Sequence, residues 1–440
     1  MTGRDGVTVG IDIGTTSVKA VAVDPDGQVV SRARIRHPLL GTGPDELRHD
    51  VQRAWRRGPR RALAALGDVR PVALSVTGMV PSLAAVTRRG TPLSQGLLYG
   101  DRRGLSLDTP VGAESAEFLR VLSQAHPQAG AFWPAQTTAL AALGAPAVVA
   151  ETTSYVLAPL TKDFRWDPEV LAACGVDESR LPRIVPDGAP VGRVGDMLLD
   201  PGGIDVMCER MVSGATRDGD VLVLCGTTLV VIVRLPVGHV VPDSIACYPD
   251  GADANIGTTA SNAGGLFLDW VDRLVAPASG PVPPDRIPIW SPYVRGERTP
   301  WQDPYRRAHL VDLHLGHDAA AVRQAAYEAS AFVVRHHLDL MAAPTRRIVA
   351  VGGGTRSTGW MQALADATGL PVDVQALPEG AAMGAAFLAR VTAGLETAHA
   401  DAARWARTGH RVEPRPEWTG AVASRYRRFR ELADRQPGRD

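Results

Sequence analysis

Apolar and polar residues alternate along the start of the chain in the manner of β-structure. Val7, Val9 and Ile11 lead into a polar, glycine-containing segment at 12–17, and the apolar pattern resumes at Val18. A period of two residues interrupted by a short polar segment is typical of two strands joined by a turn. The chain is therefore predicted to open with a β-hairpin.

The middle of the chain repeats this arrangement. An apolar run at 220–224 reaches a Cys-Gly-Thr-Thr segment at 225–228, and a second apolar run follows at 229–233. Each half of the chain thus opens with a hairpin around a Gly-Thr turn. This indicates an internal duplication of architecture, although the two sequences differ.

Helical periodicity alternates with short strands along the rest of the chain. Because strands and helices alternate in both halves, the predicted fold class is α/β. A chain of 440 residues is too long for one ordinary core, so we expect two domains, at 1–217 and 218–440. The principal predicted helices are 45–66, 319–341, 359–368 and 380–393. The principal predicted strands are 71–77 and 347–351.

Composition and charge indicate which kinds of partner the protein can have. Apolar residues make up 45% and charged residues 21%, and 47 basic residues balance 47 acidic ones. A protein that binds nucleic acid mainly by charge carries a basic excess, so no nucleic-acid partner is expected. Lysine occurs only at positions 19 and 162, so the other 45 basic residues are arginines.

Cysteine spacing and the apolar runs indicate the compartment. The four cysteines are widely spaced without a CxxC pair, which favours reduced thiols over a disulfide or zinc framework. The amino terminus is polar, and the longest apolar stretch, at 221–233, is interrupted at 226–228 and too short to cross a bilayer. We therefore expect a cytoplasmic protein with no membrane partner.

The first Gly-Thr turn carries candidate chemistry. Gly14 would let the backbone approach a phosphate closely, and the amides and hydroxyls of Thr15 and Thr16 would form a small anion-binding concavity. Asp12, just before the turn, could hold Mg²⁺ directly or through its water ligands. The alternative is a plain hairpin turn whose polar side chains cap their own backbone.

The second turn strengthens the phosphate interpretation because Gly226, Thr227 and Thr228 occupy the matching place in the second half. Lys19 follows the first turn on the emerging strand, where its ammonium could reach a phosphate oxygen. An ordinary surface lysine is the alternative.

Three glycines at 352–354 follow the predicted strand at 347–351 and precede a helix. Such a strand–helix junction suits close passage of a nucleotide. The segment is not GxGxxG and no Walker Lys-Ser/Thr pair follows, so Rossmann and P-loop interpretations both fail. A tight strand–helix turn without a ligand remains the alternative.

The order of two hairpin turns and a glycine triplet resembles the actin–hexokinase superfamily, and more specifically the FGGY carbohydrate kinases of the xylulokinase-like branch. The resemblance rests on five segments in order. They are the first phosphate motif at 9–19, a Tyr-x-Asp-x-Arg segment at 99–103, a GERTPxxDP loop at 296–304, an adenosine motif at 352–357 and a Gly-Ala-Ala segment at 384–386.

The resemblance implies two actin/hexokinase-like (ribonuclease H-like) domains with a nucleotide cleft between them, ATP and Mg²⁺ as cofactors, and a small polyhydroxylated acceptor. It leaves a homodimer open. It implies that Met79, Asp101 and Arg102 line the acceptor site, and that Asp12 binds Mg²⁺. The implied cofactor-binding residues are Asp12, Gly14, Thr15, Thr16, Lys19, Gly226, Thr227, Thr228, Gly353, Gly354 and Ser357.

The resemblance also implies the catalytic base. The family's base is an Asp in a Gly-x-Gly-Asp turn, and the corresponding stretch here is 202–205, which makes Asp205 the expected base. Phosphorylation of a hydroxyl needs such a proton acceptor. From the residue alone, Asp205 could instead cap a helix that begins at Val206.

The departures from the family pattern lie in the first domain. Val206 stands where an amide side chain normally occurs, residues 78–81 read Gly-Met-Val-Pro where xylulokinases carry Gln-Met-His-Gly, and a polar loop is skipped after Thr161. We infer a shortened first domain with a smaller or less polar acceptor pocket, suited to a cyclitol, a deoxy sugar or a non-sugar alcohol. Two alternatives to a kinase remain. One is a degenerate member that binds nucleotide or sugar and regulates a partner, and the other is an enzyme that uses ATP for another group transfer.

Overall fold

The computed structural model describes residues 6–41, 46–103, 113–250, 254–278, 280, 282–376 and 379–435. The chain forms two compact units. Unit 1 comprises Met1–Val212 and Glu379–Ala406, and unit 2 comprises Ser213–Pro378 and Arg407–Asp440. The first crossing lies close to the expected boundary at 217/218. The segment 379–406, which was expected in the second domain, packs instead with the first.

A mixed sheet with strand order β13-β14-β5-β1-β2-β3 forms the centre of unit 1. The predicted opening hairpin is present as β1 and β2, and the predicted strand at 71–77 runs parallel to β1 as β5. A short strand, β15, also pairs with β5 in parallel. The strand bounds are β1 Thr8–Ile13, β2 Ser17–Val23, β3 Val29–Arg36, β5 Ala73–Gly78, β13 Gly192–Val194, β14 Met197–Leu199 and β15 Gly203–Ile204.

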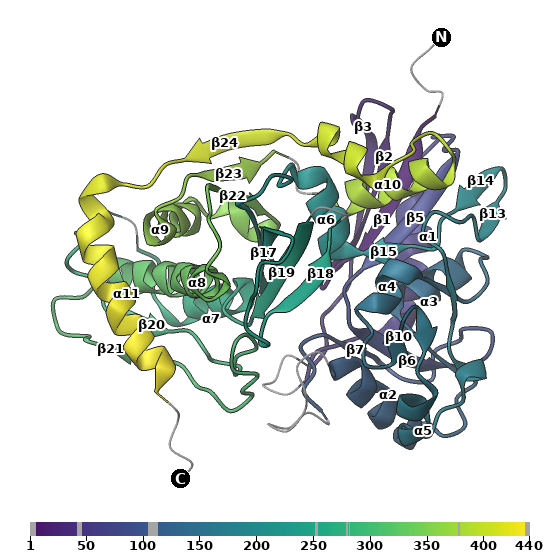
Figure 1. Cartoon of the computed structure of the whole chain (residues 1–440), viewed down its shortest axis with the longest axis horizontal. Helices are drawn as coiled ribbons and strands as arrows, with labels where there is room; N and C mark the ends of the chain where they lie inside the picture. Colours follow the sequence, from purple (N-terminus) through teal and green to yellow (C-terminus); the bar gives the residue numbers. More distant parts are fainter. Residues whose placement is uncertain are drawn as a thin grey trace. The chain divides into compact units, whose positions relative to one another are not determined.

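Helix α10 (Gly380–Thr392) lies against β1 although almost the whole chain separates them (Figure 1). A Cβ atom at Gly10 would lie 1.7 Å from the carbonyl oxygen of Ala382, so the helix rests directly on the strand backbone. The Thr8 hydroxyl donates to the Ala386 carbonyl at 2.8 Å. Gly384 allows an equally close approach to α6 (Asp205–Ser213). This contact between small residues explains why 379–406 belongs to unit 1.

The rest of unit 1 contains a four-stranded sheet of order β4-β7-β6-β8 and several short helices. The helix predicted at 45–66 begins later, as a π-helical turn at Gln52–Arg57 followed by α1 (Gly58–Ala64), because Arg48–His49 pairs with β7 as β4. The remaining bounds are β6 Ser82–Val86, β7 Gly96–Leu98, β8 Ala131–Trp133, β9 Val148–Ala150, β10 Thr161–Lys162, β11 Arg165–Trp166, β12 Arg183–Val185, α2 Glu114–Ala125, α3 Ala135–Ala142, α4 Glu151–Tyr155 and α5 Pro168–Ala173.

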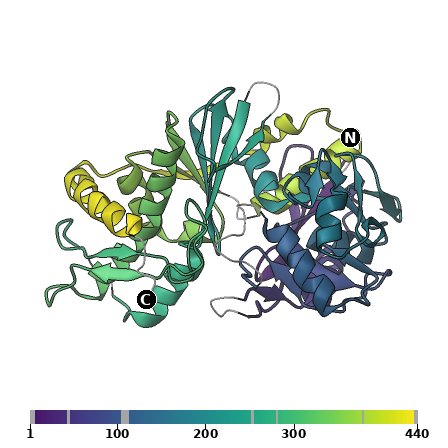
Figure 2. The same ribbon diagram turned by 60° about the horizontal axis from the view of Figure 1, so that its bottom comes forward.

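Unit 2 is built on a sheet of order β18-β19-β17-β16-β22-β23-β24. The second predicted hairpin is present as β16 and β17, and the predicted strand at 347–351 is β22, parallel to β16. Helices α8 and α9 pack on each other, and the C-terminal helix α11, yellow in Figures 1 and 2, lies against both. The bounds are β16 Asp220–Cys225, β17 Leu229–Pro236, β18 Ala246–Pro249, β19 Ala254–Ser261, β20 Ile289–Ser291, β21 His309–Val311, β22 Arg347–Val351, β23 Val372–Gln375, β24 Thr408–Val412, α7 Gly265–Leu274, α8 Ala319–Met341, α9 Thr358–Thr368 and α11 Thr419–Asp434.

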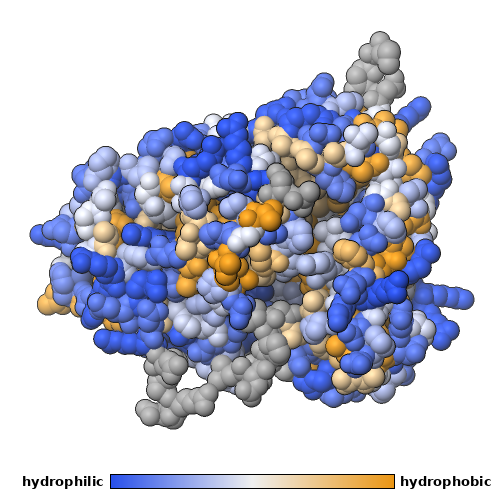
Figure 3. Space-filling model, in the orientation of Figure 1, coloured by the Kyte–Doolittle hydropathy of each residue, from blue (hydrophilic) through white to orange (hydrophobic). Residues whose placement is uncertain are grey.

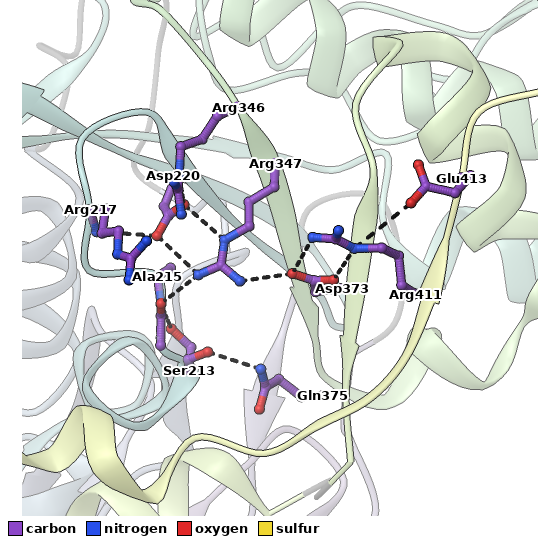
Figure 4. A network of polar contacts seen from close by, with 11 residues as sticks. Ser213, Ala215, Arg217, Asp220, Arg346, Arg347, Asp373, Gln375, Arg411 and Glu413 are labelled. Carbon is purple, nitrogen blue, oxygen red and sulfur yellow. Dashed lines mark hydrogen bonds and ion pairs between the residues drawn. The ribbon is translucent and has the colours of Figure 1, made fainter.

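An ion-pair network joins four strands at one end of this sheet (Figure 4). The Arg347 guanidinium donates to Asp220 at 2.9 and 3.1 Å, to Asp373 at 2.8 Å and to the Gly214 carbonyl at 2.9 Å. Arg411 of β24 donates to the same Asp373 at 2.7 Å. The network thus ties β16, β22, β23 and β24 together and includes the backbone where the chain enters unit 2.

Hydrophilic residues cover much of the face drawn in Figure 3, and orange hydrophobic residues occur among them in smaller groups. Among the described residues, every helix is too short or too polar to cross a bilayer. The four cysteines are free thiols, and Cys247 is the exposed one.

Candidate active site

Three parallel strands of unit 1 end together and bring the predicted residues to one edge of the sheet. Strand register places Ile13 of β1 beside Gly78 of β5, and Gly78 beside Ile204 of β15. The residues that follow these strand ends are the first Gly-Thr turn, Met79 and Asp205. The carboxyl ends of parallel strands are where α/β folds place their ligand sites. The structure therefore assembles these three predicted elements.

The first Gly-Thr turn is closed by a hydrogen bond from the Gly14 amide to the Ser17 carbonyl at 3.0 Å. The Thr15 hydroxyl lies 3.2 Å from the Tyr99 hydroxyl, which joins the turn to the segment at 99–103. Thr16 is exposed, whereas Gly14 and Thr15 are partly buried. The turn is thus accessible on one side and held from the other.

A buried histidine that the sequence did not single out holds this turn. The Trp55 indole donates to Nδ1 of His49 at 3.0 Å, so the hydrogen of the neutral ring lies on Nε2. That Nε2–H group donates to the Thr15 carbonyl at 2.7 Å. Burial lowers the pKa of His49 to about 4, which keeps the ring neutral at physiological pH. Because tertiary packing brings His49 to the turn, no local motif indicated it.

Asp12 and Lys19 face each other across the hairpin. They are register partners in β1 and β2, and Lys19 Nζ lies 3.8 Å from Asp12 Oδ2. Burial raises the pKa of Asp12, and the Lys19 ammonium partly opposes this shift. The cross-strand pair places one cation beside a buried carboxylate just before the first Gly-Thr turn.

Asp205 is the first residue of α6 and is partly exposed. Its Oδ1 accepts a hydrogen bond from the Val206 amide at 2.7 Å. The pKa of Asp205 is raised to about 7: removal from water is the largest cause, the negative charge of Asp12 adds to the rise, and Lys19 opposes it. A carboxyl group that titrates near neutral pH suits proton transfer, because the efficiency of a general base is greatest when its pKa is near the working pH.

Glu209 lies one helical turn after Asp205 and was missed from the sequence. Its carboxylate rests on the start of α10, where a Cβ atom at Gly380 would lie 2.3 Å from Oε1. The pKa of Glu209 is raised to about 7: burial is the largest cause, Lys19 opposes the shift, and Asp12 and Asp205 add to it. The spacing of four residues from Asp205 is the one sequence signal that could have indicated it.

On the expected acceptor side, Met79 is buried directly after β5 and Arg102 is partly buried. Asp101 is buried, and its carboxylate accepts hydrogen bonds from the Leu47 amide at 3.1 Å and from the Arg103 guanidinium at 2.9 and 2.8 Å. These bonds use the Asp101 oxygens to hold the surrounding segments.

Gln136, also missed from the sequence, links two parts of the site. Its buried Nε2 donates to the Gly78 carbonyl at 2.9 Å and to the Gly203 carbonyl at 3.2 Å. Gly78 precedes Met79, and Gly203 lies two residues before Asp205. One side chain at the start of α3 thus fixes the end of β5 before Met79 to the strand before Asp205.

In unit 2, the second Gly-Thr turn and the glycine triplet lie together because β16 and β22 are parallel neighbours. The Gly226 amide donates to the Thr228 carbonyl at 3.1 Å, and the turn is partly exposed. Gly352 has φ +93°, and a Cβ atom there would lie 2.9 Å from the Cys225 carbonyl. A Cβ atom at Gly354 would lie 2.1 Å from the Trp360 ring. These two glycines permit the close approach.

Ser357 and Gly353 are not needed for the close approach that Gly352 and Gly354 permit. The Ser357 hydroxyl caps α9 by accepting from the Trp360 amide at 3.3 Å. Gly353 is exposed at the tip of the segment. The hydroxyl therefore has a structural partner, while Gly353 is available to a ligand.

The fit of a divalent cation rests on Asp12. Within the described ranges, no three Asp, Glu, His or Cys side chains converge as a metal-binding group. Asp12 nevertheless presents a buried carboxylate whose negative charge also raises the pKa of Asp205 and Glu209. This arrangement suits an ion held chiefly by phosphate oxygens and water, with Asp12 as its protein partner.

Each unit contains an antiparallel hairpin beside a parallel strand, with a Gly-Thr turn at the hairpin tip. This duplicated architecture is the two-domain actin/hexokinase-like fold, as predicted. The ligand-bound xylulose kinase from Lactobacillus acidophilus has the same fold, with a TM-score of 0.82, 20% identity and 98% coverage of both chains.

Sequence comparison gives the family. The N-terminal domain model of the FGGY family of carbohydrate kinases matches residues 7–111, and the C-terminal domain model matches residues 254–393. The chain is 27% identical to a xylulose kinase of Streptomyces coelicolor over 91% of this chain and 90% of that protein. It is 25% identical to a glycerol kinase of Polaromonas naphthalenivorans over 88% and 90%, respectively.

The chain belongs to the FGGY family of carbohydrate kinases, and the predicted similarity to the xylulokinase-like branch is confirmed. It is accordingly an ATP-dependent kinase of a sugar or polyol.

Proposed function

We propose that the enzyme transfers the γ-phosphoryl group of ATP to a hydroxyl of a small sugar, polyol or related alcohol, with Asp205 as the general base. The observation that carries this proposal is the position of Asp205 at the ends of β1, β5 and β15, with its pKa raised to about 7. A base of this kind is ionised in a substantial fraction of molecules at neutral pH and binds a proton readily.

In the proposed reaction, the acceptor hydroxyl gives its proton to a carboxylate oxygen of Asp205. The acceptor oxygen forms a bond to the γ-phosphorus while the bond from that phosphorus to the bridging oxygen breaks, and ADP leaves. Asp205 then loses the proton to solvent. Lys19 contributes a positive charge beside Asp12 and limits the rise in the pKa of Asp205.

The phosphates of ATP are proposed to bind the two Gly-Thr turns. The proposed phosphate-binding residues are Gly14, Thr15, Thr16 and the turn at 226–228, and Gly353 and Gly354 are proposed to lie beside the adenosine. Bound Mg²⁺, for which Asp12 is the fitting side chain, supplies charge neutralisation of the phosphates. Because the chain has only two lysines, backbone amides and hydroxyls are well suited to bind the phosphates.

The acceptor is proposed to lie beside Met79, Arg102 and Asp205. Because the Asp101 carboxylate is occupied by Leu47 and Arg103, we assign it to holding the segment rather than to binding the acceptor. Buried Met79 next to Val80 gives this side an apolar character. The proposal therefore favours a smaller or less polar acceptor than D-xylulose.

A panel of acceptors tests this proposal. The wild-type protein, Mg²⁺ and ATP are incubated with D-xylulose, glycerol, gluconate, deoxy sugars and cyclitols, and acceptor-dependent ADP release is measured. The expected result is turnover above the acceptor-free rate with one class, and a lower kcat/KM for D-xylulose. Efficient D-xylulose turnover would refute the smaller pocket, and no acceptor-dependent ADP release with any compound would refute the acceptor class.

A further inference from the structure

The GERTPxxDP loop at 296–304 places a buried carboxylate at its centre. Glu297 is 2% exposed. Its Oε2 accepts from the Ser261 hydroxyl at 2.6 Å, and its Oε1 accepts from the Asn262 amide at 3.2 Å and the Arg298 amide at 2.6 Å. A buried carboxylate that accepts several hydrogen bonds fixes the backbone that donates them. Glu297 thus holds the turn that follows β19.

The loop itself is closed and anchored to the sheet. Glu297 and Asp303 exchange two backbone hydrogen bonds of 2.8 Å each. The Thr299 amide donates to the Ala260 carbonyl at 3.1 Å, and the Ala260 amide donates to the Thr299 hydroxyl at 3.2 Å. The carboxylate is therefore presented from a rigid frame on the last residues of β19.

The turn that Glu297 holds continues directly into α7. Ser261 accepts a further hydrogen bond from the Ala263 amide at 3.0 Å, and the Ala263 carbonyl accepts from the Ser330 hydroxyl of α8 at 2.7 Å. Gly264 follows, and a Cβ atom there would lie 2.4 Å from the carbonyl carbon of Thr228. The start of α7 therefore lies against the second Gly-Thr turn.

Two backbone hydrogen bonds complete the connection. The Gly265 amide donates to the Gly226 carbonyl at 2.8 Å, and the Leu266 amide donates to the Thr227 carbonyl at 3.0 Å. The helix start thus fixes two successive peptide planes of the turn. An amide that binds phosphate belongs to such a plane, so its direction depends on where α7 begins.

We propose that Glu297 is a positioning residue for the nucleotide phosphates, acting through the turn at 261–263 and the start of α7 on the Gly-Thr turn at 226–228. The inference rests on the proposed function, in which that turn binds the phosphates of ATP. It assigns a role to a motif that the catalytic residues leave unexplained.

Nucleotide binding without acceptor tests the inference, with Mg²⁺ and a non-hydrolysable ATP analogue as the probe in isothermal titration calorimetry. Glu297→Ala leaves the Ser261 hydroxyl and two amides without their acceptor, and its Kd is expected to rise about tenfold. Glu297→Gln keeps one acceptor oxygen and the side-chain shape, and its Kd is expected to rise by about threefold. In steady-state assays, KM for ATP should rise while KM for the acceptor changes less than about twofold.

Glu328→Ala is the matched control, because Glu328 is also a buried carboxylate of unit 2. Glu328 of α8 accepts hydrogen bonds of 2.6 and 2.8 Å from the guanidinium of Arg425 of α11. This variant is expected to lose thermal stability while keeping the wild-type Kd. Equal losses of affinity in Glu297→Ala and Glu328→Ala, or wild-type affinity in a destabilised Glu297→Ala, would overturn the inference.

If Glu297→Ala does not fold, Ser261→Ala and Glu297→Gln carry the test. Each is expected to raise the Kd, and the double variant should add little to the larger single effect, because both residues act through one contact. Wild-type affinity in both would overturn the inference. Failure of the wild-type protein itself to bind the analogue would instead overturn the proposed function.

Discussion

At the scale of residues, the proposed chemistry depends on three acids of unit 1 and on Lys19 beside them. The negative charge of Asp12 raises the pKa of Asp205 and Glu209, and the Lys19 ammonium opposes the pKa rise of all three acids. Burial and like charge both favour the protonated form of a carboxyl group. Asp205 is consequently set to exchange a proton near neutral pH, where an exposed aspartate would stay ionised.

The raised pKa of Asp205 has a consequence for stability. Between pH 4 and 7 the folded protein binds the Asp205 proton more tightly than the unfolded chain does, so this contribution to stability is lost as pH rises through about 7. Asp205→Asn removes the titration. Its melting temperature relative to wild type is expected to be higher at pH 8 than at pH 5, as measured by calorimetry.

Asp68→Asn, at an exposed position, is the control and should show no such pH-dependent difference. The same melting-temperature difference for Asp205→Asn at both pH values would contradict the raised pKa.

The sequence predicted Asp12 and Asp205 because each lies in a local motif beside a strand end. His49, Glu209 and Gln136 were not predicted, since tertiary contacts give them their partners: the Thr15 carbonyl, Gly380 at the start of α10, and the Gly78 and Gly203 carbonyls. A sequence motif indicates only residues that are close along the chain. The partners of these three residues are distant along the chain and become neighbours only in the folded structure.

At the scale of elements, the predicted hairpins and the predicted helices at 319–341, 359–368 and 380–393 are present with nearly the predicted bounds. The packing partner of α10 was not predicted, because its sequence is nearly all small and apolar and does not mark the face that meets β1. The reason for the contact lies in Gly10, 370 residues before the helix begins at Gly380. Because of this long-range contact, residues 379–406 belong to unit 1, whereas a single boundary at 217/218 was expected.

Gly10→Ala tests the importance of this contact. The new Cβ atom would overlap the Ala382 carbonyl, so the strand and the helix must separate. The free energy of unfolding, measured in urea, is expected to fall by about 3 kcal/mol, the upper end of the usual range for overpacked cores.

Gly420→Ala in α11 is the matched substitution, because a Cβ atom there meets open space. It is expected to be neutral or to stabilise by up to about 1 kcal/mol. Equal stability of the two variants would show that α10 does not depend on Gly10.

At the scale of the whole molecule, the chain crosses between its two units at 212/213, 378/379 and 406/407. The network of Arg347, Asp220, Asp373 and Arg411 lies within unit 2 and includes the Gly214 carbonyl, just after the first crossing. Buried carboxylates in such a network depend on the cation they share. The network therefore fixes the sheet edge from which the chain departs and to which it returns.

Arg347→Met removes the guanidinium shared by Asp220 and Asp373, both of which are buried. The free energy of unfolding is expected to fall by about 3 kcal/mol, since two buried charges lose a partner. Denaturant unfolding followed by tryptophan fluorescence would measure the change.

Arg346→Met is the neighbouring control. Arg346 also contacts Asp220, but its side chain is 43% exposed, so a loss of less than about 1 kcal/mol is expected. Similar losses in the two variants would show that the position of Arg347 in the network gives it no special role.

The proposal that Asp205 is the general base of a sugar or polyol kinase is tested most directly by comparing product formation in wild type and Asp205→Asn. With the best acceptor of the panel, saturating Mg²⁺ and ATP at pH 8, mass spectrometry would quantify the phosphorylated acceptor over time. We predict that Asp205→Asn keeps nucleotide affinity and lowers kcat by about 10²–10⁴-fold, the range for loss of a general base. Phosphorylated acceptor formed by Asp205→Asn at the wild-type rate would contradict the proposal.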